Sequence, residues 1–157
     1  MNPWKWMKIG QYMHRSMYAI GLGPLIGRIV LLLTTTGRKT GKRRVTPLQY
    51  EEIDGVYYIG AARGAKADWF RNLLANPQVE VRVKKQQFHG VAEPITDPTR
   101  IADYLETRLQ RHPRMVGAMM RMHNLPSKPS RTQLEELAPK LAVVAIRPTT
   151  PNIERAT

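Results

Sequence analysis

The alternation of apolar and polar residues along the chain predicts a domain rich in β-strands. Residues 29–33 form an unbroken apolar run that leads into three threonines, as expected of a buried strand. Residues 79–83 alternate strictly between apolar and polar, which is the period of a strand with one buried face. Asp54 and Gly55 tolerate positive φ and predict a hairpin turn. We expect six strands, at residues 29–33, 45–51, 56–61, 79–83, 88–95 and 141–146.

Apolar residues between these strands recur at steps of three and four, which is the period of a helix. Asp68 is expected to cap a helix that ends before Pro77, because proline disfavours helix in the residue before it. Asp97 followed by Pro98 predicts a second helix start, and a short third helix is expected at residues 115–122. Strands with inserted helices indicate an α+β class, with a β-barrel closed partly on itself.

The length of 157 residues favours one domain, which we place at residues 1–148. Residues 124–139 carry three prolines and many polar side chains, and are expected to form a lid or loop with a short helical turn at residues 132–137. Residues 149–157 are expected to be a flexible tail.

Residues 3–20 predict an amphipathic helix with Trp6, Ile9 and Met13 on one face and Lys5 and Lys8 largely on the other. Two interpretations remain open. The apolar face packs on the domain's own core, or it lies on a membrane surface, where tryptophan opposite lysine suits the headgroup boundary. The following apolar stretch is broken by glycine and proline, so we expect neither a transmembrane helix nor a signal peptide.

The formal net charge of +13 is unevenly distributed, because the first fifty residues carry nine Lys and Arg and no carboxylate. Five of these charges follow Gly37 within the basic loop, residues 37–44, whose two glycines let backbone N–H groups approach an anion. A solvated loop, a phosphate site and a nucleic-acid site are all compatible with this charge. Nucleic acid is the less favoured partner, because aromatic residues are not interleaved with the basic ones.

The absence of cysteine fits a reducing cytosol, and the four scattered histidines predict no metal site. No spacing of nucleophile and base stands out, so no catalytic side chain is assigned. This suits an enzyme whose cofactor carries the difficult chemistry.

The order of the motifs resembles one family. The run from Leu31 to Gly41 is followed by Arg44-Val45-Thr46-Pro47-Leu48, then by the turn Gly60 to Gly64, and then by Trp69-Phe70-Arg71-Asn72-Leu73 with Ala75-Asn76-Pro77. These four blocks, between about residues 29 and 84, look like the deazaflavin (F420)-dependent nitroreductase and quinone-reductase family. The resemblance implies a split β-barrel like that of flavin reductases and pyridoxamine-phosphate oxidases.

The resemblance also implies which residues bind coenzyme F420. Those matching Arg38, Lys39, Thr40 and Arg44 contact the phosphate and the acidic tail, where arginine binds an oxyanion through two donors and lysine acts as a point charge. The deazaflavin and its linker are lined by residues matching Val45, Thr46, Pro47, Leu48, Gln49, Gly60, Ala61, Ala62 and Arg63. Residues matching Trp69 and Asn72 form the far wall.

By this resemblance the reaction is hydride transfer from reduced F420 to a hydrophobic acceptor such as a quinone, a nitro compound or an activated alkene. The alternatives are a barrel that binds F420, FMN, haem or a fatty acyl chain without turnover and, less favoured, a nucleic-acid-binding protein. Ala62 stands where many relatives have serine, and Met115 and Ala118 stand where tyrosines line the acceptor side. These departures leave the acceptor open. A cytoplasmic monomer or homodimer, peripheral at the inner face of the membrane if residues 3–20 bind lipid, is expected.

The two interpretations of the first helix are separated by deleting residues 1–20. If this helix binds lipid, the deletion abolishes co-sedimentation with anionic liposomes and leaves cofactor affinity intact, because the basic loop is untouched. Equal sedimentation of the truncated and full-length proteins argues that the helix packs on the barrel.

Overall fold

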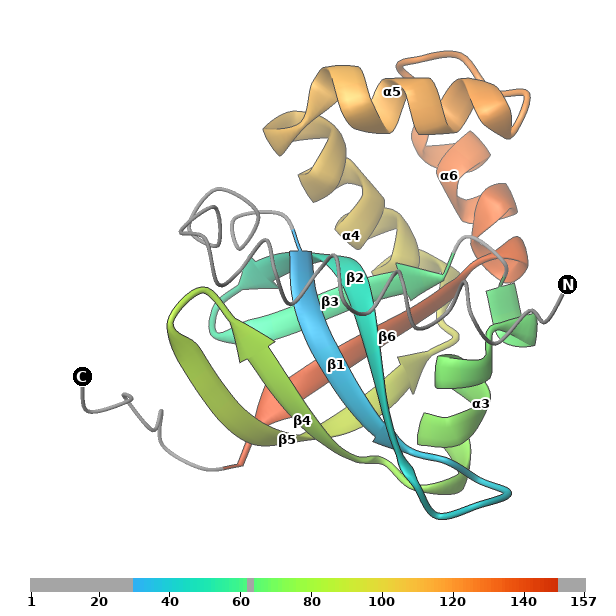
Figure 1. Cartoon of the computed structure of the whole chain (residues 1–157). Coiled ribbons are helices and arrows are strands. Elements are labelled where there is room, and N and C mark those ends of the chain that lie inside the picture. The colour runs from blue at the N-terminus through green and yellow to red at the C-terminus, as the bar shows by residue number, and fades with distance from the viewer. Residues whose placement is uncertain (1–29, 62–63, 150–157) are drawn as a thin grey trace, which may run out of the picture.

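The computed structural model describes residues 30–61 and 64–149. Six antiparallel strands close into a barrel in the order β1-β2-β3-β6-β5-β4 (Figure 1). The closed barrel confirms the predicted α+β class. The strands are β1 (Val30–Thr36), β2 (Arg43–Ile53), β3 (Val56–Ala61), β4 (Gln78–Val83), β5 (Gln86–Ile95) and β6 (Ala142–Pro148).

The turns of the three hairpins, β1–β2, β2–β3 and β4–β5, are short, and each contains a positive φ angle. Asp54 and Gly55 adopt φ of 52° and 77° between β2 and β3, as the Asp-Gly pair predicts. Lys84 adopts φ of 53° in the turn between β4 and β5. All six predicted strands are present, and most extend one to three residues beyond their predicted ends, because the pairing continues into polar residues such as Arg43.

Alternate residues of the strands point inward and fill the barrel. Leu31, Leu33 and Ile59 are fully buried there. Phe88 is central to this core, since its ring centroid lies 5.0 Å from that of Tyr57, which in turn contacts Tyr50 at 5.8 Å. The short helix α3 (Asp68–Ala75) adds Trp69, Phe70 and Leu73 to the same core.

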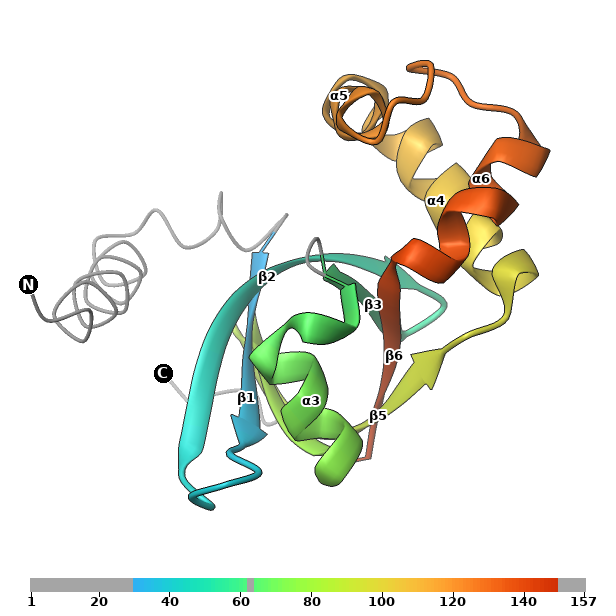
Figure 2. The ribbon, with the colours of Figure 1, turned by 90° about the vertical axis from the view of Figure 1, so that its right-hand side faces the viewer.

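A second core lies outside the barrel, between the outer face of β3, β5 and β6 and three helices. The helices are α4 (Pro98–Arg111), α5 (Pro113–Met122) and α6 (Arg131–Leu137), which we call the helical cap. Leu105, Met120 and Leu134 from these helices are buried together with Val143 and Ala145 of β6. The cap lies at one end of the barrel and the β1–β2 hairpin at the other, as both views show (Figure 1 and Figure 2).

The predicted helix starts had different outcomes. Asp97 caps α4 as expected, because its carboxylate accepts a hydrogen bond from the backbone N–H of Thr99 at 2.9 Å. The prediction for Asp68 was wrong: Ala67 holds the cap position of α3, and the Asp68 carboxylate binds Arg38 instead. A tertiary ion pair therefore replaces the local cap.

The segment at residues 124–139 contains α6, which begins with a capping box at Ser130 and Gln133. Leu134 and Leu137 of this helix are buried in the cap. Arg131 also binds Asp103 of α4 at 2.7 Å, so α6 packs firmly on α4. Whether the segment also acts as a lid stays a prediction.

The predicted helix at residues 3–20 and most of the predicted tail lie outside the described residues. Within the part of the chain that the structure describes, none of the helices combines the length and apolar character needed to cross a bilayer.

The barrel core predicts a stability test at Phe88. Replacing Phe88, which is 1% exposed, with alanine should lower the free energy of unfolding by about 3–5 kcal/mol, through lost burial and a residual cavity. Val91 is 36% exposed on the same strand, so Val91→Ala is the matched control and should cost less than about 1 kcal/mol. Chemical denaturation measures both, and similar losses would contradict the inward placement of Phe88.

Candidate functional site

The basic loop is a tight turn between β1 and β2. The backbone N–H of Gly37 donates to the carbonyl of Lys42 at 2.7 Å, and the N–H of Gly41 donates to the carbonyl of Gly37 at 2.8 Å. Gly41 adopts φ of 67°, and a Cβ on Gly37 would lie only 2.9 Å from Oγ1 of Thr40. Both glycines are therefore required for this turn, which leaves the Lys39 side chain exposed at its tip.

Arg38 is held against helix α3 by Asn72. Its backbone N–H and its Nη1 both donate to Oδ1 of Asn72, at 3.2 and 2.9 Å. Nη2 of Arg38 binds the exposed carboxylate of Asp68 at 3.2 Å. Asn72 is itself buried and donates to Oγ1 of Thr35 at 3.5 Å. The predicted tail residue Arg38 and the predicted wall residue Asn72 are thus in direct contact.

Two of the five positive charges of the loop are already paired, Arg38 with the exposed Asp68 and Arg43 with the more buried Glu80. Arg43 binds the carboxylate of Glu80 at 2.6 Å. Burial acts to raise the pKa of Glu80, but hydrogen bonds from Arg43 and Gln87 outweigh it and hold this pKa below its ordinary value. An anion at the loop would consequently meet Arg38, Lys39, Lys42 and Arg44 rather than Arg43.

Strand β2 divides the predicted lining residues between two faces. Leu48 packs against the barrel core, and Thr46, two residues before it, is also only partly exposed. Val45, Pro47 and Gln49 are exposed on the outer face. At about 3.4 Å per residue, β2 runs about 17 Å from Arg44 to Gln49. An elongated ligand anchored at the loop can therefore reach Gln49.

The end of β3 provides a position without a side chain. A Cβ on Gly60 would lie 3.5 Å from the hydroxyl of Tyr104, a residue of α4. Ala61 pairs with Ala142 of β6, while the predicted residues Ala62 and Arg63 lie outside the described residues. Trp69 is 8% exposed and stacks edge-on against Phe70 at 6.0 Å, so it lies mostly within the barrel core.

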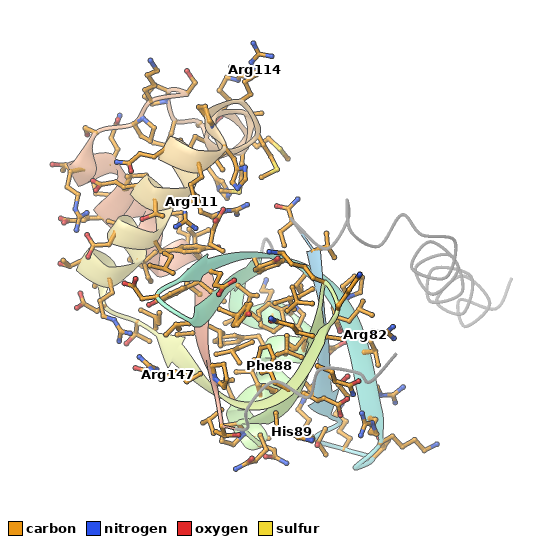
Figure 3. All side chains as sticks on the ribbon, turned by 90° about the vertical axis from the view of Figure 1, so that its left-hand side faces the viewer. Arg82, Phe88, His89, Arg111, Arg114 and Arg147 are labelled. Carbon is orange, nitrogen blue, oxygen red and sulfur yellow. The ribbon has the colours of Figure 1, made fainter. Side chains whose placement is uncertain are left out.

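Sequence analysis missed a buried polar cluster where β2 meets α4. Glu51 is 4% exposed and binds Arg108 at 3.4 Å, Arg111 at 3.1 Å and Nε2 of His112 at 3.0 Å. Figure 3 shows Arg111 at the junction between the helical cap and the barrel. Arg108 also donates from Nη2 to Oε1 of Gln49 at 3.2 Å. The available signal was Glu51 itself, the first carboxylate after nine basic residues, but its partners lie 57 to 61 residues later.

Tyr104 completes this junction. Its ring stacks on Tyr58 with centroids 5.8 Å apart, and the guanidinium of Arg108 lies 5.9 Å from the ring centroid. Its hydroxyl is buried and has no hydrogen-bond partner among the described residues. Burial raises the pKa of this hydroxyl, which therefore stays protonated at neutral pH.

A half-open pocket of about 200 Å³ lies between α4 and the β2–β3 turn, with Tyr104 in its wall. It is lined by Ile53, Tyr58, Arg100, Asp103, Tyr104 and Thr107, none of which belongs to the predicted cofactor set. The exposed members of the predicted set instead follow β2 from the loop to Gln49. Its cations suit an anionic tail, whereas Tyr104 of α4 fills the space beside Gly60.

Solved structures share this fold. An F420-H2 dependent reductase (FDR-A) is 24% identical, with a TM-score of 0.52 over 76% of this chain and 93% of that one. A pyridoxamine 5'-phosphate oxidase-like protein from Listeria innocua is 14% identical, with a TM-score of 0.56 over 83% of this chain and 94% of the other. At these identities the likeness establishes the split-barrel fold alone.

Sequence comparison identifies the family. The F420H(2)-dependent quinone reductase of Mycobacterium tuberculosis is 41% identical over 68 residues, which cover 41% of this chain and 46% of the relative. The matched stretch thus spans about half the length of that relative. The sequence profile of the F420H(2)-dependent quinone reductase family matches residues 6–126, which include the basic loop, β2 and α4. This match confirms the resemblance, and the chain belongs to the F420H(2)-dependent quinone reductase family.

Proposed function

We propose that this protein reduces quinones with F420H2, and that the basic loop binds the anionic tail of the cofactor. The observation that carries the proposal is the loop itself. Its turn is fixed by two backbone hydrogen bonds, and its Arg38 is oriented by Asn72 before any ligand arrives. A donor that is already oriented loses little conformational entropy on binding, so it favours tight association.

Each residue of the loop would contribute differently to the tail. Arg38 keeps donors that Asn72 and Asp68 do not use, and these suit a phosphate or carboxylate oxygen. Lys39 and Arg44 are exposed and add charge that attracts the tail over about 8–10 Å at physiological salt. Thr40 is engaged in the turn, where its Oγ1 accepts from the N–H of Lys42 at 3.3 Å. Its part in the proposal is to hold the loop.

The ring would lie farther along the outer face of β2, against Val45, Pro47 and Gln49 and the end of β3. When bound, F420H2 supplies the hydride that the acceptor receives. The protein's own residues would orient the ring and keep water away, with no covalent side chain required. The residues at positions 60 to 63 are assigned to the ring by the family resemblance.

The acceptor would approach from the helical cap, where the four methionines of α5 differ in exposure. Met120 is fully buried and Met122 is 84% exposed, whereas Met115 is 37% exposed and Met119 is partly buried. Met115 and Met119 are therefore the methionines that could touch a ligand while packed on the cap. Flexible thioethers suit an apolar, variable acceptor, so quinones are proposed first, with nitro compounds and activated alkenes as further acceptors.

Peripheral attachment to the inner face of the cytoplasmic membrane through residues 3–20 belongs to the same proposal. Such a location would bring the acceptor site close to membrane-dissolved quinones. The liposome experiment with the truncated chain tests this part independently of cofactor binding.

Cofactor binding provides the main test. Arg38→Ala/Lys39→Ala should weaken binding of oxidised F420 by about 10- to 100-fold, because two charge-assisted contacts to the tail are lost. Fluorescence titration measures the affinity, and raising the salt concentration should weaken the wild type more steeply than the variant.

The matched control is Arg121→Ala/Lys128→Ala, which removes the same charge from exposed positions of the cap. This variant should bind F420 like the wild type. Equal losses in both variants would show that net charge alone attracts the cofactor. Tight F420 binding without reduction of quinone, nitro or alkene substrates would favour a binding protein. Tighter binding of FMN than of F420 would identify FMN as the cofactor instead.

A second test concerns the orientation of Arg38. Asn72→Ala leaves the Arg38 backbone N–H without its acceptor, so it should lower the free energy of unfolding by about 1–3 kcal/mol and weaken F420 binding several-fold. Asp68→Asn is the control, because Asp68 is 84% exposed and its ion pair contributes at most about 1 kcal/mol. It should leave F420 affinity unchanged or higher, since it removes a competing anion beside Arg38. Weaker F420 binding by Asp68→Asn would contradict this account.

A further inference from the structure

The contact between Gln49 and Arg108 fixes the direction in which an exposed amide faces. Gln49 is exposed on the outer face of β2, and its side-chain oxygen lies 3.2 Å from Nη2 of Arg108. A guanidinium has only donors, so the oxygen of the amide must face it. The Nε2 group of Gln49 therefore points away from Arg108, with two N–H donors on the exposed side.

Arg108 cannot easily turn away from Gln49. It is 6% exposed, binds the Glu51 carboxylate at 3.4 Å and lies over the Tyr104 ring at 5.9 Å. Glu51 is in turn held by Arg111 and His112, at 3.1 and 3.0 Å. Arg108, Glu51, Arg111 and His112 are thus linked to one another, whereas the described residues provide no partner for Nε2 of Gln49.

The surroundings of Gln49 are formed by β1, β3 and α4. Gln49 pairs with Val30 of β1. On β3, the pairing of Tyr50 with Ile59 brings Gly60 opposite Gln49 one step further along the strands. The space beside Gly60 is filled by Tyr104 of α4, whose hydroxyl would lie 3.5 Å from a Cβ there. The buried hydroxyl of Tyr104 lies beside this glycine, so the polar groups at this point come from β2 and α4 together.

We propose that Gln49 donates a hydrogen bond from Nε2 to a carbonyl oxygen of a conjugated ring, and that Arg108 and Glu51 are positioning residues for this donor. The inference rests on the proposed function, because the ring is either the deazaflavin or the quinone. Both carry carbonyl oxygens, and a neutral amide donor suits either. The contact is a hydrogen bond and involves no covalent step.

The decisive variant is Gln49→Glu. Glutamate keeps an oxygen for Arg108 but has no N–H to offer, so the positioning contact persists while the donor is lost. Gln78→Glu is the matched control, with the same charge change at an exposed position at the start of β4. Both variants should melt within about 4 °C of the wild type, as expected of surface substitutions.

Two measurements distinguish the source of the carbonyl. In the first, oxidised F420 is titrated without acceptor, and in the second, kcat and KM for menadione are measured at saturating F420H2. A loss of about tenfold or more in F420 affinity for Gln49→Glu assigns the donor to the deazaflavin. A rise of similar size in the menadione KM, with F420 affinity unchanged, assigns it to the acceptor. Gln49→Glu behaving like Gln78→Glu in both measurements overturns the proposal.

Arg108→Met tests the positioning role and should reproduce part of the Gln49→Glu effect, with partial rescue by Arg108→Lys. The side-chain amide resonances of Gln49 give a readout that needs no turnover. They should shift when either probe binds and should differ between the wild type and Arg108→Met before any ligand is added. If the wild type binds no F420, the proposed function fails. If the Gln49 amide resonances also do not shift when menadione is added, the proposed donor role of Gln49 is overturned as well.

Discussion

The buried carboxylate of Glu51 is the constraint on which the arrangement of barrel and cap depends. A carboxylate left in the interior without partners would cost about 3–5 kcal/mol, so Glu51 requires the cations that surround it. Arg108 and Arg111 come from the last turn of α4 and His112 from the residue after it. Satisfying one charge on β2 therefore fixes where the C-terminal end of α4 lies, and with it the second core of the protein.

This constraint explains why the candidate site extends over two separate elements. β2 presents Val45, Pro47 and Gln49 outward because the residues between them, Thr46 and Leu48, face the barrel interior. The helical cap reaches one end of that face because Arg108 of α4 forms an ion pair with Glu51. At the opposite end, α3 orients Arg38 through Asn72. The outer face of β2 is thus supported by a different helix at each end.

Local signals in the sequence predicted the strands and helices, whereas contacts between distant residues decided which polar side chains pair. Asp54-Gly55 and Asp97-Pro98 were read correctly, because a turn and a helix start depend on neighbouring residues. Asp68 was misread, since Arg38, thirty residues earlier, competes for its carboxylate. The Glu51 cluster carries no periodicity and no short spacing. Its partners could be identified only once it was known that Glu51 lies on the outer face of β2 and that the end of α4 packs against this face.

The two ends of the outer face act on a ligand through different physical forces. The basic loop uses net charge, which salt screens within about 10 Å, whereas Gln49 uses the direction of a neutral amide, which salt leaves intact. About 17 Å of strand separates Arg44 from Gln49, so the loop has little electrostatic effect on the amide. The two proposals therefore predict that substitutions in the loop and at Gln49 act independently, the first on affinity for an anionic tail and the second on orientation of a ring.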